Sequence, residues 1–199
     1  RKWFPDKLLE FHCHNDFGMA TANAIAAITG GANSAHTAIN GLGERAGNIA
    51  LEELAIAGQM AMGIDFGLDL TRLNRISKLA AQFSRFPYAA NKPVIGSNLF
   101  NVDSGMIIHI LAAADKAGFP KLAMLPYQPG AVGRDDFRFV YGKGAGGAAL
   151  DRFLKELGIE ATQEQRKEIL EKLKTEAALR KAFLEKDEFL HIIKSVINK

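Results

Sequence analysis

Short apolar runs and longer helical stretches alternate over the first 85 residues. Residues 7–14, KLLEFHCH, have the shortness and apolar character of a buried strand, and residues 33–39, NSAHTAI, predict a second short strand. Between them, residues 16–32 are rich in helix formers, and Gly30 supplies a plausible helix end. Residues 49–63 predict a second helix that is apolar on nearly every face. Strands and helices alternating through short loops predict an α/β fold, with parallel strands covered by helices.

The pattern changes beyond this region. Residues 86–103 lose periodicity and gather Pro, Gly and Asn, which is typical of a linker. Residues 104–199 are mainly helical and more charged, with one strand predicted at residues 136–141. We therefore predict an α/β domain at residues 1–85, a linker at 86–103 and helical accessory subdomains at 104–199. The last helix is expected to bury a stripe formed by Phe189, Ile192, Ile193, Val196 and Ile197.

Composition excludes several classes of protein. The net charge is +3 and the pI about 9.0, but basic residues are scattered among acidic ones, so a nucleic-acid or membrane surface is not expected. No apolar run approaches the ~18 residues of a membrane span. A single cysteine fits a reducing compartment. These features predict a cytoplasmic protein.

Two of the five histidines bracket Cys13 at the end of the first predicted strand. Because side chains alternate along a strand, His12 and His14 would point to one face and Cys13 to the other. Two imidazoles side by side, at the end of a strand where barrel sites gather, favour a pair of metal ligands. The alternative is two hydrogen-bonded histidines at a strand end, with Asp16 capping the next helix.

A glycine-rich loop, NGLGERAGN, follows the second predicted strand. It brings Asn40, Glu44, Arg45 and Asn48 to the same end of the neighbouring strand, and its glycines let the backbone approach a ligand closely. Glu44 is thereby a candidate catalytic residue. The alternative is a capped turn with a surface ion pair between Glu44 and Arg45.

The segments HCHNDFGMATANAIAAITGGAN and NGLGERAGNIALEE together closely resemble the signature of the metal-dependent metallolyase barrels. This family includes 2-isopropylmalate, homocitrate and citramalate synthases, with 3-hydroxy-3-methylglutaryl-CoA lyase as a relative. GERAGN is similar to the synthase form, whereas the lyase has a cysteine in this loop. The resemblance continues less specifically through NKPVIGSNLFNVDSG, LPYQPGAVGR and GKGAGG.

The resemblance implies that residues 1–85 are the last two β-α units of a TIM barrel, followed by a mainly α-helical accessory region. It implies a divalent metal (Zn, Mn or Mg) bound by His12 and His14, with Asn48 at the position of a further, sometimes water-mediated, ligand. It also implies an acyltransferase, similar to 2-isopropylmalate synthase, that condenses acetyl-CoA with a 2-oxo acid. The metal would act as the Lewis acid.

A TIM barrel contains eight strands, and only two are predicted in the part of the chain that resembles it. The family's first strand, with an arginine and an acidic metal ligand, has no counterpart. We therefore expect the chain alone to be inactive. It would be the C-terminal portion of a longer synthase or, less favoured, a subunit whose partner supplies the missing N-terminal barrel portion. The family usually dimerises by exchanging the accessory region, so the intact enzyme is expected to be a homo-oligomer.

One motif departs from the family. Synthases carry Ser-Gly-Ile-His in the accessory region, and its histidine assists proton transfer. Here SGMIIHI puts Ile107 at that position and His109 two residues later. In a helix, two residues turn a side chain by about 200°, whereas an extended segment keeps the same face. His109 is a candidate catalytic residue or an ordinary helix residue. A carbon-carbon lyase and a non-catalytic assembly subunit are the alternative functions, and Ile107 favours the latter.

Two further features admit competing interpretations. GKGAGG matches the dinucleotide fingerprint at Gly142, Gly144 and Gly147, but no second parallel strand or terminal acidic residue follows. A turn into a helix is predicted instead, with an anion at the helix start as an open alternative. His36 either points inward beside the metal or, as we favour, is a hydrogen-bonded core residue.

Overall fold

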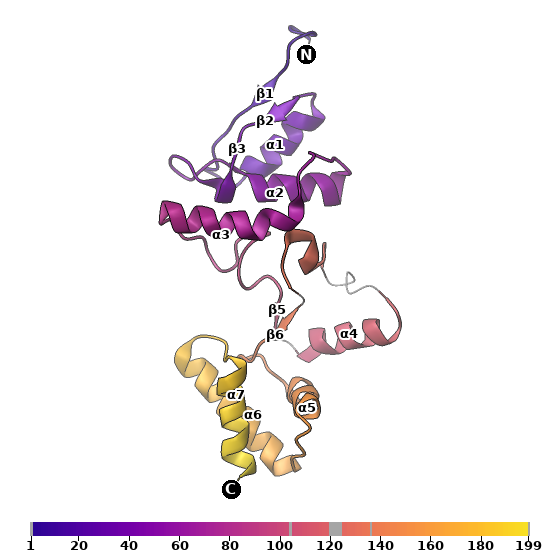
Figure 1. The fold of residues 1–199 in the computed structure, drawn as a ribbon, viewed down its shortest axis with the longest axis vertical. Coiled ribbons are helices and arrows are strands. Elements are labelled where there is room, and N and C mark those ends of the chain that lie inside the picture. Colours follow the sequence, from indigo (N-terminus) through magenta and orange to yellow (C-terminus); the bar gives the residue numbers. More distant parts are fainter. Residues whose placement is uncertain (1, 104, 120–124, 136, 199) are drawn as a thin grey trace. The chain divides into compact units, whose positions relative to one another are not determined.

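The computed structural model describes residues 2–103, 105–119, 125–135 and 137–198. The chain divides into two compact units, Arg1–Leu99 with Tyr127–Asp136, and Phe100–Pro126 with Phe137–Lys199. The elements of the first unit are β1 (Glu10–Phe11), α1 (Ala20–Thr29), β2 (Ser34–Ala35), β3 (Thr37–Ala38), β4 (Ile49–Ala50), α2 (Leu51–Ile56) and α3 (Leu73–Ser84). Those of the second are β5 (Asn101–Val102), α4 (Gly105–Lys116), β6 (Arg138–Phe139), α5 (Gly147–Glu156), α6 (Gln163–Arg180) and α7 (Lys186–Ile197) (Figure 1).

The first unit has the predicted α/β character, with parallel strands beside helices. β1 pairs in parallel with β2, and β3 pairs in parallel with β4. α1 packs against β2, β4 and α2, and its Ala20 and Ala24 are buried with Ile49 and Leu54. Both strands are shorter than the predicted segments at residues 7–14 and 33–39, since regular pairing between β1 and β2 covers only two residues on each strand.

Helix α1 begins four residues later than the sequence pattern predicts. The Asn15 side-chain oxygen accepts a hydrogen bond from the Ala20 amide at 3.0 Å, so Asn15 holds the start of the helix. The alternative role for Asp16, as the cap of this helix, is wrong. The helix ends at Gly30 as predicted. The second predicted helix begins as α2 and passes at Ala57–Ala61 into a wider π-helical turn.

Residues 127–135 pack with the first unit, although the sequence pattern groups them with the helical region. Their 3₁₀ turn, Pro129–Val132, contacts a second 3₁₀ turn at Leu70–Arg72. The Arg134 guanidinium donates to the carbonyl oxygens of Gly96 and Ser97, at 2.8 and 3.2 Å. These long-range contacts leave no local signal in the sequence. The domain boundaries at residues 85 and 104 stay a prediction.

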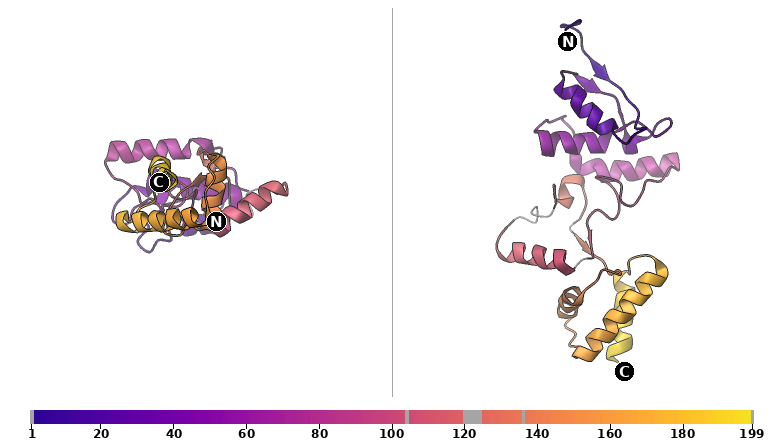
Figure 2. Two further views of the ribbon diagram at one scale, coloured as in Figure 1. Left: turned by 90° about the horizontal axis from the view of Figure 1, so that it is seen from below. Right: turned by 180° about the vertical axis from the view of Figure 1, so that it is seen from behind.

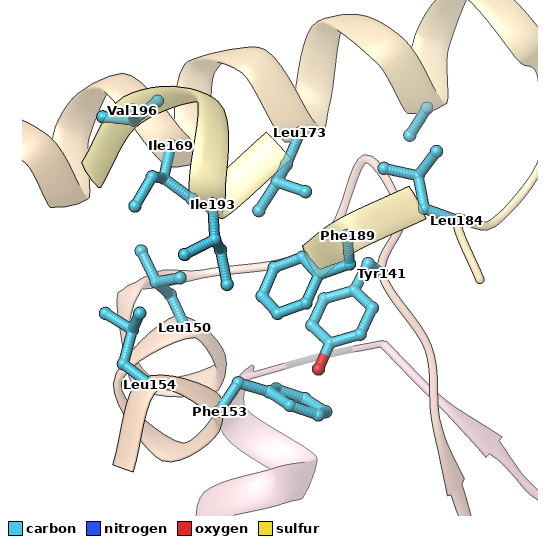
Figure 3. Close-up of a cluster of buried hydrophobic side chains, with 11 residues drawn as sticks. Tyr141, Leu150, Phe153, Leu154, Ile169, Leu173, Leu184, Phe189, Ile193 and Val196 are labelled. Atoms are coloured by element: carbon cyan, nitrogen blue, oxygen red, sulfur yellow. The ribbon is translucent and has the colours of Figure 1, made fainter. Parts of the chain in front are cut away.

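The second unit is mainly helical, as predicted for this region. Helices α6 and α7 run side by side (Figures 1 and 2). Phe189, Ile193 and Val196 of the predicted stripe are buried in a core with Tyr141 and with side chains from α5 and α6 (Figure 3). The strand pair β5 and β6 is parallel, and the sequence pattern indicated only its second member.

Within the described residues, no helix has both the length and the apolar composition needed to cross a membrane.

Candidate metal centre

The candidate site of the first unit lies where β1 and β2 end side by side. Phe11 stands opposite Ala35 in the parallel ladder, and the His36 amide donates to the Phe11 carbonyl at 2.8 Å. This register places the residues that follow, His12 and His36, next to each other. A separate antiparallel bridge joins His14 to Asn48, so the glycine-rich loop returns to the same place.

The side chains alternate across this segment as the pattern predicts. Cys13 packs on the α1 side, with its sulfur 3.7 Å from the Ala20 carbonyl oxygen, and burial raises the pKa of its thiol. The rings of His12 and His14 lie on the other side, with centroids 5.0 Å apart. Their Nε2 atoms are separated by 3.3 Å. The two histidines thus present the same ring nitrogen toward one another.

This spacing fits a shared metal ion. Two nitrogens that bind one ion at about 2.05 Å in tetrahedral geometry lie about 3.3 Å apart. His14 also has the support that a metal-binding imidazole needs, because its Nδ1 lies 3.3 Å from the Glu44 carbonyl oxygen. On the opposite edge of the His12 ring, Nδ1 lies 3.0 Å from Nδ1 of His36.

Asn48 adds an oxygen that has no partner. Its side-chain nitrogen donates to the Leu42 carbonyl at 3.1 Å, whereas its Oδ1 is buried without a hydrogen-bond partner in the described part of the chain. A Cβ on Gly43 would lie 2.5 Å from the Asn48 nitrogen, so the amide occupies space that only glycine leaves open. Gly43 therefore lets the Asn48 side chain of the same loop approach the backbone, whereas the sequence analysis expected the loop glycines to admit a ligand. An unpartnered buried oxygen is the donor type expected for a further direct or water-mediated ligand.

Glu44 and Arg45 do not form the ion pair considered as the alternative. Arg45 instead donates twice to Asp16, from Nε at 2.9 Å and from a terminal nitrogen at 3.1 Å. The hydrogen bond from Arg45 lowers the pKa of the Asp16 carboxyl. The Glu44 side chain is exposed, and only its carbonyl reaches His14. The Arg45–Asp16 pair therefore ties the loop to the segment that follows β1.

The beginning of the loop is held by a buried carboxylate that the sequence analysis missed. Asn40 has a positive φ of 62°, and its amide donates to Glu52 Oε2 at 3.0 Å while its side-chain nitrogen donates to the Ser77 carbonyl at 2.9 Å. Glu52 is only 1% exposed, and burial raises its pKa. Lys92 lies 3.5 Å from Glu52 and 2.8 Å from Glu53. The sequence signal was a charged pair inside an otherwise apolar helix.

The accessory-region candidates lie in the second unit. Ile107 on α4 packs against Val102, Leu111 and Ala149, which gives it an apolar packing role. His109 lies on the same helix, but its side chain falls outside the described residues.

His36 is not the core histidine that the sequence analysis favours, because its side chain is exposed beside His12. Within the residues that the structure describes, no cluster of three or more His, Cys, Asp or Glu side chains capable of holding a metal is present. The described residues therefore offer two imidazoles and one amide oxygen to a candidate metal site. The metal-ligand and catalytic roles of His12, His14, Asn48, Glu44 and His109 stay predictions.

A parallel α/β unit with a pair of histidines at the end of a strand is typical of metal-binding α/β proteins. A sequence model of the HMGL-like family matches residues 3–80. The chain is 40% identical over 166 residues to a putative (R)-citramalate synthase of Methanosarcina mazei, covering 83% of this chain and 33% of that protein. It is 36% identical over 188 residues to a homocitrate synthase of Methanothermobacter thermautotrophicus, covering 94% and 46%. A homocitrate synthase of Nostoc sp. is 37% identical over 187 residues, covering 94% and 48%.

Residues 3–80 therefore belong to the HMGL-like family, and this matched segment contains the histidine pair and the whole glycine-rich loop. The chain spans between one third and one half of the length of these curated relatives.

Proposed function

We propose that this chain carries the last two β-α units of a TIM barrel and one side of the divalent-metal site of an acetyl-CoA-condensing acyltransferase. The observation that carries the proposal is the pair of Nε2 atoms of His12 and His14, 3.3 Å apart at the end of a parallel strand pair. The HMGL-like match supports the barrel and, through the family's general use of a divalent metal, the ion.

In this proposal, His12 and His14 hold the ion through Nε2, and Asn48 supplies an oxygen directly or through water. The metal would polarise the carbonyl group of a chelated 2-oxo acid, as a Lewis acid, toward attack by the enolate of acetyl-CoA. The Glu44 carbonyl holds the His14 ring by accepting from Nδ1. The exposed Glu44 carboxylate is our candidate for proton transfer from this loop. His109 stays a second candidate.

The proposed substrates are acetyl-CoA and a 2-oxo acid, and the product a 2-alkylmalate-type acid. The relatives are named citramalate and homocitrate synthases. Pyruvate and 2-oxoglutarate are therefore the first substrates to test, alongside 2-oxoisovalerate, which a 2-isopropylmalate synthase would use. The other barrel strands are required for activity in this proposal, and they come from the same polypeptide or from a partner subunit.

The native protein containing this chain tests the proposal directly. We expect its purified form to hold a divalent ion and to release CoA from acetyl-CoA in the presence of at least one of the three acids. His12→Ala and His14→Ala should remove the metal, whereas His191→Ala, at an exposed position on α7, should retain it. A metal-free native protein that releases no CoA with any of the acids would overturn the proposal.

Two alternatives differ in their products. A lyase of the same superfamily would cleave a carbon-carbon bond and release acetyl-CoA or a free acyl product, so product analysis distinguishes it. A non-catalytic assembly subunit is favoured by Ile107, because an isoleucine packed among apolar side chains cannot transfer a proton. That alternative predicts no metal at His12 and His14, even with the rest of the barrel present.

A further inference from the structure

His36 lies beside the proposed metal ligands without facing the ion. Its Nδ1 is 3.0 Å from Nδ1 of His12, and the two ring centroids are 4.9 Å apart. Nδ1 and Nε2 stand on different edges of an imidazole, and the Nε2 edge of His12 is the one turned toward His14. His36 therefore contacts the edge of His12 that stays free when Nε2 binds a metal.

A neutral imidazole carries one proton on one of its two nitrogens. When Nε2 of His12 gives its lone pair to a metal, Nδ1 must carry the proton, and this N–H requires an acceptor. His36 Nδ1 is within hydrogen-bond distance, and its exposed side chain allows its own proton to sit on Nε2 in contact with water. For His14, the Glu44 carbonyl performs the corresponding task.

We propose that His36 is a positioning residue, which accepts a hydrogen bond from His12 Nδ1–H and thereby holds His12 in the tautomer and orientation that bind the metal. The inference rests on the proposed metal site. It extends that site to a residue that binds no metal and touches no substrate.

The inference applies to the metal-loaded chain. Without metal, the same rings can form a different line of hydrogen bonds, in which His36 donates to His12, His12 donates to His14, and His14 donates to the Glu44 carbonyl. Metal binding ends the contact between His12 Nε2 and His14 Nε2 and reverses the direction of the hydrogen bond between His12 and His36. His36 can serve in both states because an imidazole nitrogen either donates or accepts.

Two substitutions of similar size distinguish the role of His36 as a hydrogen-bond acceptor from its role in filling space. His36→Asn keeps an acceptor oxygen close to the position of Nδ1, whereas His36→Leu fills the position with a methyl group. Zn²⁺ affinity is measured for the native protein that contains this chain, by competition with a chromophoric chelator. We expect His36→Leu to weaken binding about 10–100-fold and His36→Asn to retain most of the affinity. His191→Leu, at an exposed helix position in the second unit, should bind as the wild type does.

¹⁵N spectra of the zinc-loaded chain provide a second readout, since they distinguish the two tautomers. We expect His12 to carry its proton on Nδ1 and His36 on Nε2. Zinc binding by His36→Leu with wild-type affinity, or a proton on Nδ1 of His36 in the loaded chain, would overturn the inference and leave the metal site intact. Failure of the native protein that contains this chain to bind zinc through His12 and His14 would overturn the proposed metal site, and the inference would fall with it.

Discussion

The hydroxyl group of Tyr141 is buried in the core of the second unit with no hydrogen-bond partner among the described residues. The ring stacks on Phe189, with centroids 3.7 Å apart and planes 9° from parallel, and lies 4.2 Å from the Phe153 centroid (Figure 3). Burial raises the pKa of the phenol far above its usual range, so the group is neutral. The ring stabilises this core, whereas the hydroxyl costs stability.

These contacts predict how Tyr141→Phe changes the free energy of unfolding of the second unit. The change keeps the stacked ring and removes a polar group whose unsatisfied burial costs about 1–3 kcal/mol. We therefore expect the free energy of unfolding of this unit to rise by about 1 kcal/mol or more. Phe189→Leu is the opposing control, because it removes the stacked partner. Loss of an aromatic pair costs about 0.5–1.5 kcal/mol beyond the lost buried area.

The assay must report on the second unit alone, since a chain with two compact units need not unfold in one step. Native-state hydrogen exchange of the α6 and α7 amides meets this need. Protection should increase in Tyr141→Phe and decrease in Phe189→Leu. A loss of protection in Tyr141→Phe comparable to that in Phe189→Leu would show that the hydroxyl has a stabilising partner, and would refute the reasoning.

Two predictions concern the first unit. Burial raises the pKa of Glu52, so the folded state holds its proton to higher pH than the unfolded state, and this group makes stability fall as pH rises from about 4.5 through the folded-state pKa. Glu52→Gln should flatten that fall in urea titrations at several pH values; an unchanged profile would contradict the assignment, because Lys92 would then fully offset the buried charge. Gly43→Ala should displace the Asn48 amide and its bond to Leu42, lowering stability by about 1 kcal/mol and weakening Zn²⁺ binding. Gly130→Ala, where a Cβ meets nothing within 4 Å, should change neither property, and wild-type zinc affinity in Gly43→Ala would exclude Asn48 as a ligand.

The histidine pair was predictable because its geometry is local. Alternation along an extended segment is enough to place His12 and His14 on one face, and their ring nitrogens do approach within 3.3 Å. His36 was misjudged because its environment depends on strand register. Once β1 and β2 are paired with Phe11 opposite Ala35, His36 must follow beside His12. The available signal was a third histidine in the second predicted strand, directly after Ser34 and Ala35.

The contacts that hold the glycine-rich loop in place could not be predicted from local sequence patterns. Asn40 is held by Glu52 from α2 and by the Ser77 carbonyl from α3, 12 and 37 residues away in sequence. Its left-handed backbone conformation is one that asparagine adopts more readily than most residues. Sequence spacing alone cannot indicate that a glutamate in an apolar helix will turn inward to this amide.

In the GKGAGG segment, which matches the dinucleotide fingerprint, the glycine amides bind a carboxylate of the same chain. The Asp103 carboxylate accepts hydrogen bonds from the amides of Gly142 and Gly144, at 2.8 and 3.1 Å. A Cβ at either glycine would lie within 2.8 Å of an Asp103 oxygen, so the glycines are needed for the carboxylate to approach. The anion left open by the sequence pattern is therefore a side chain of the protein itself. Asp103 follows β5 and the two glycines follow β6, so these hydrogen bonds continue the contact between the two parallel strands toward the start of α5. An external phosphate would have to displace the Asp103 carboxylate to bind these amides.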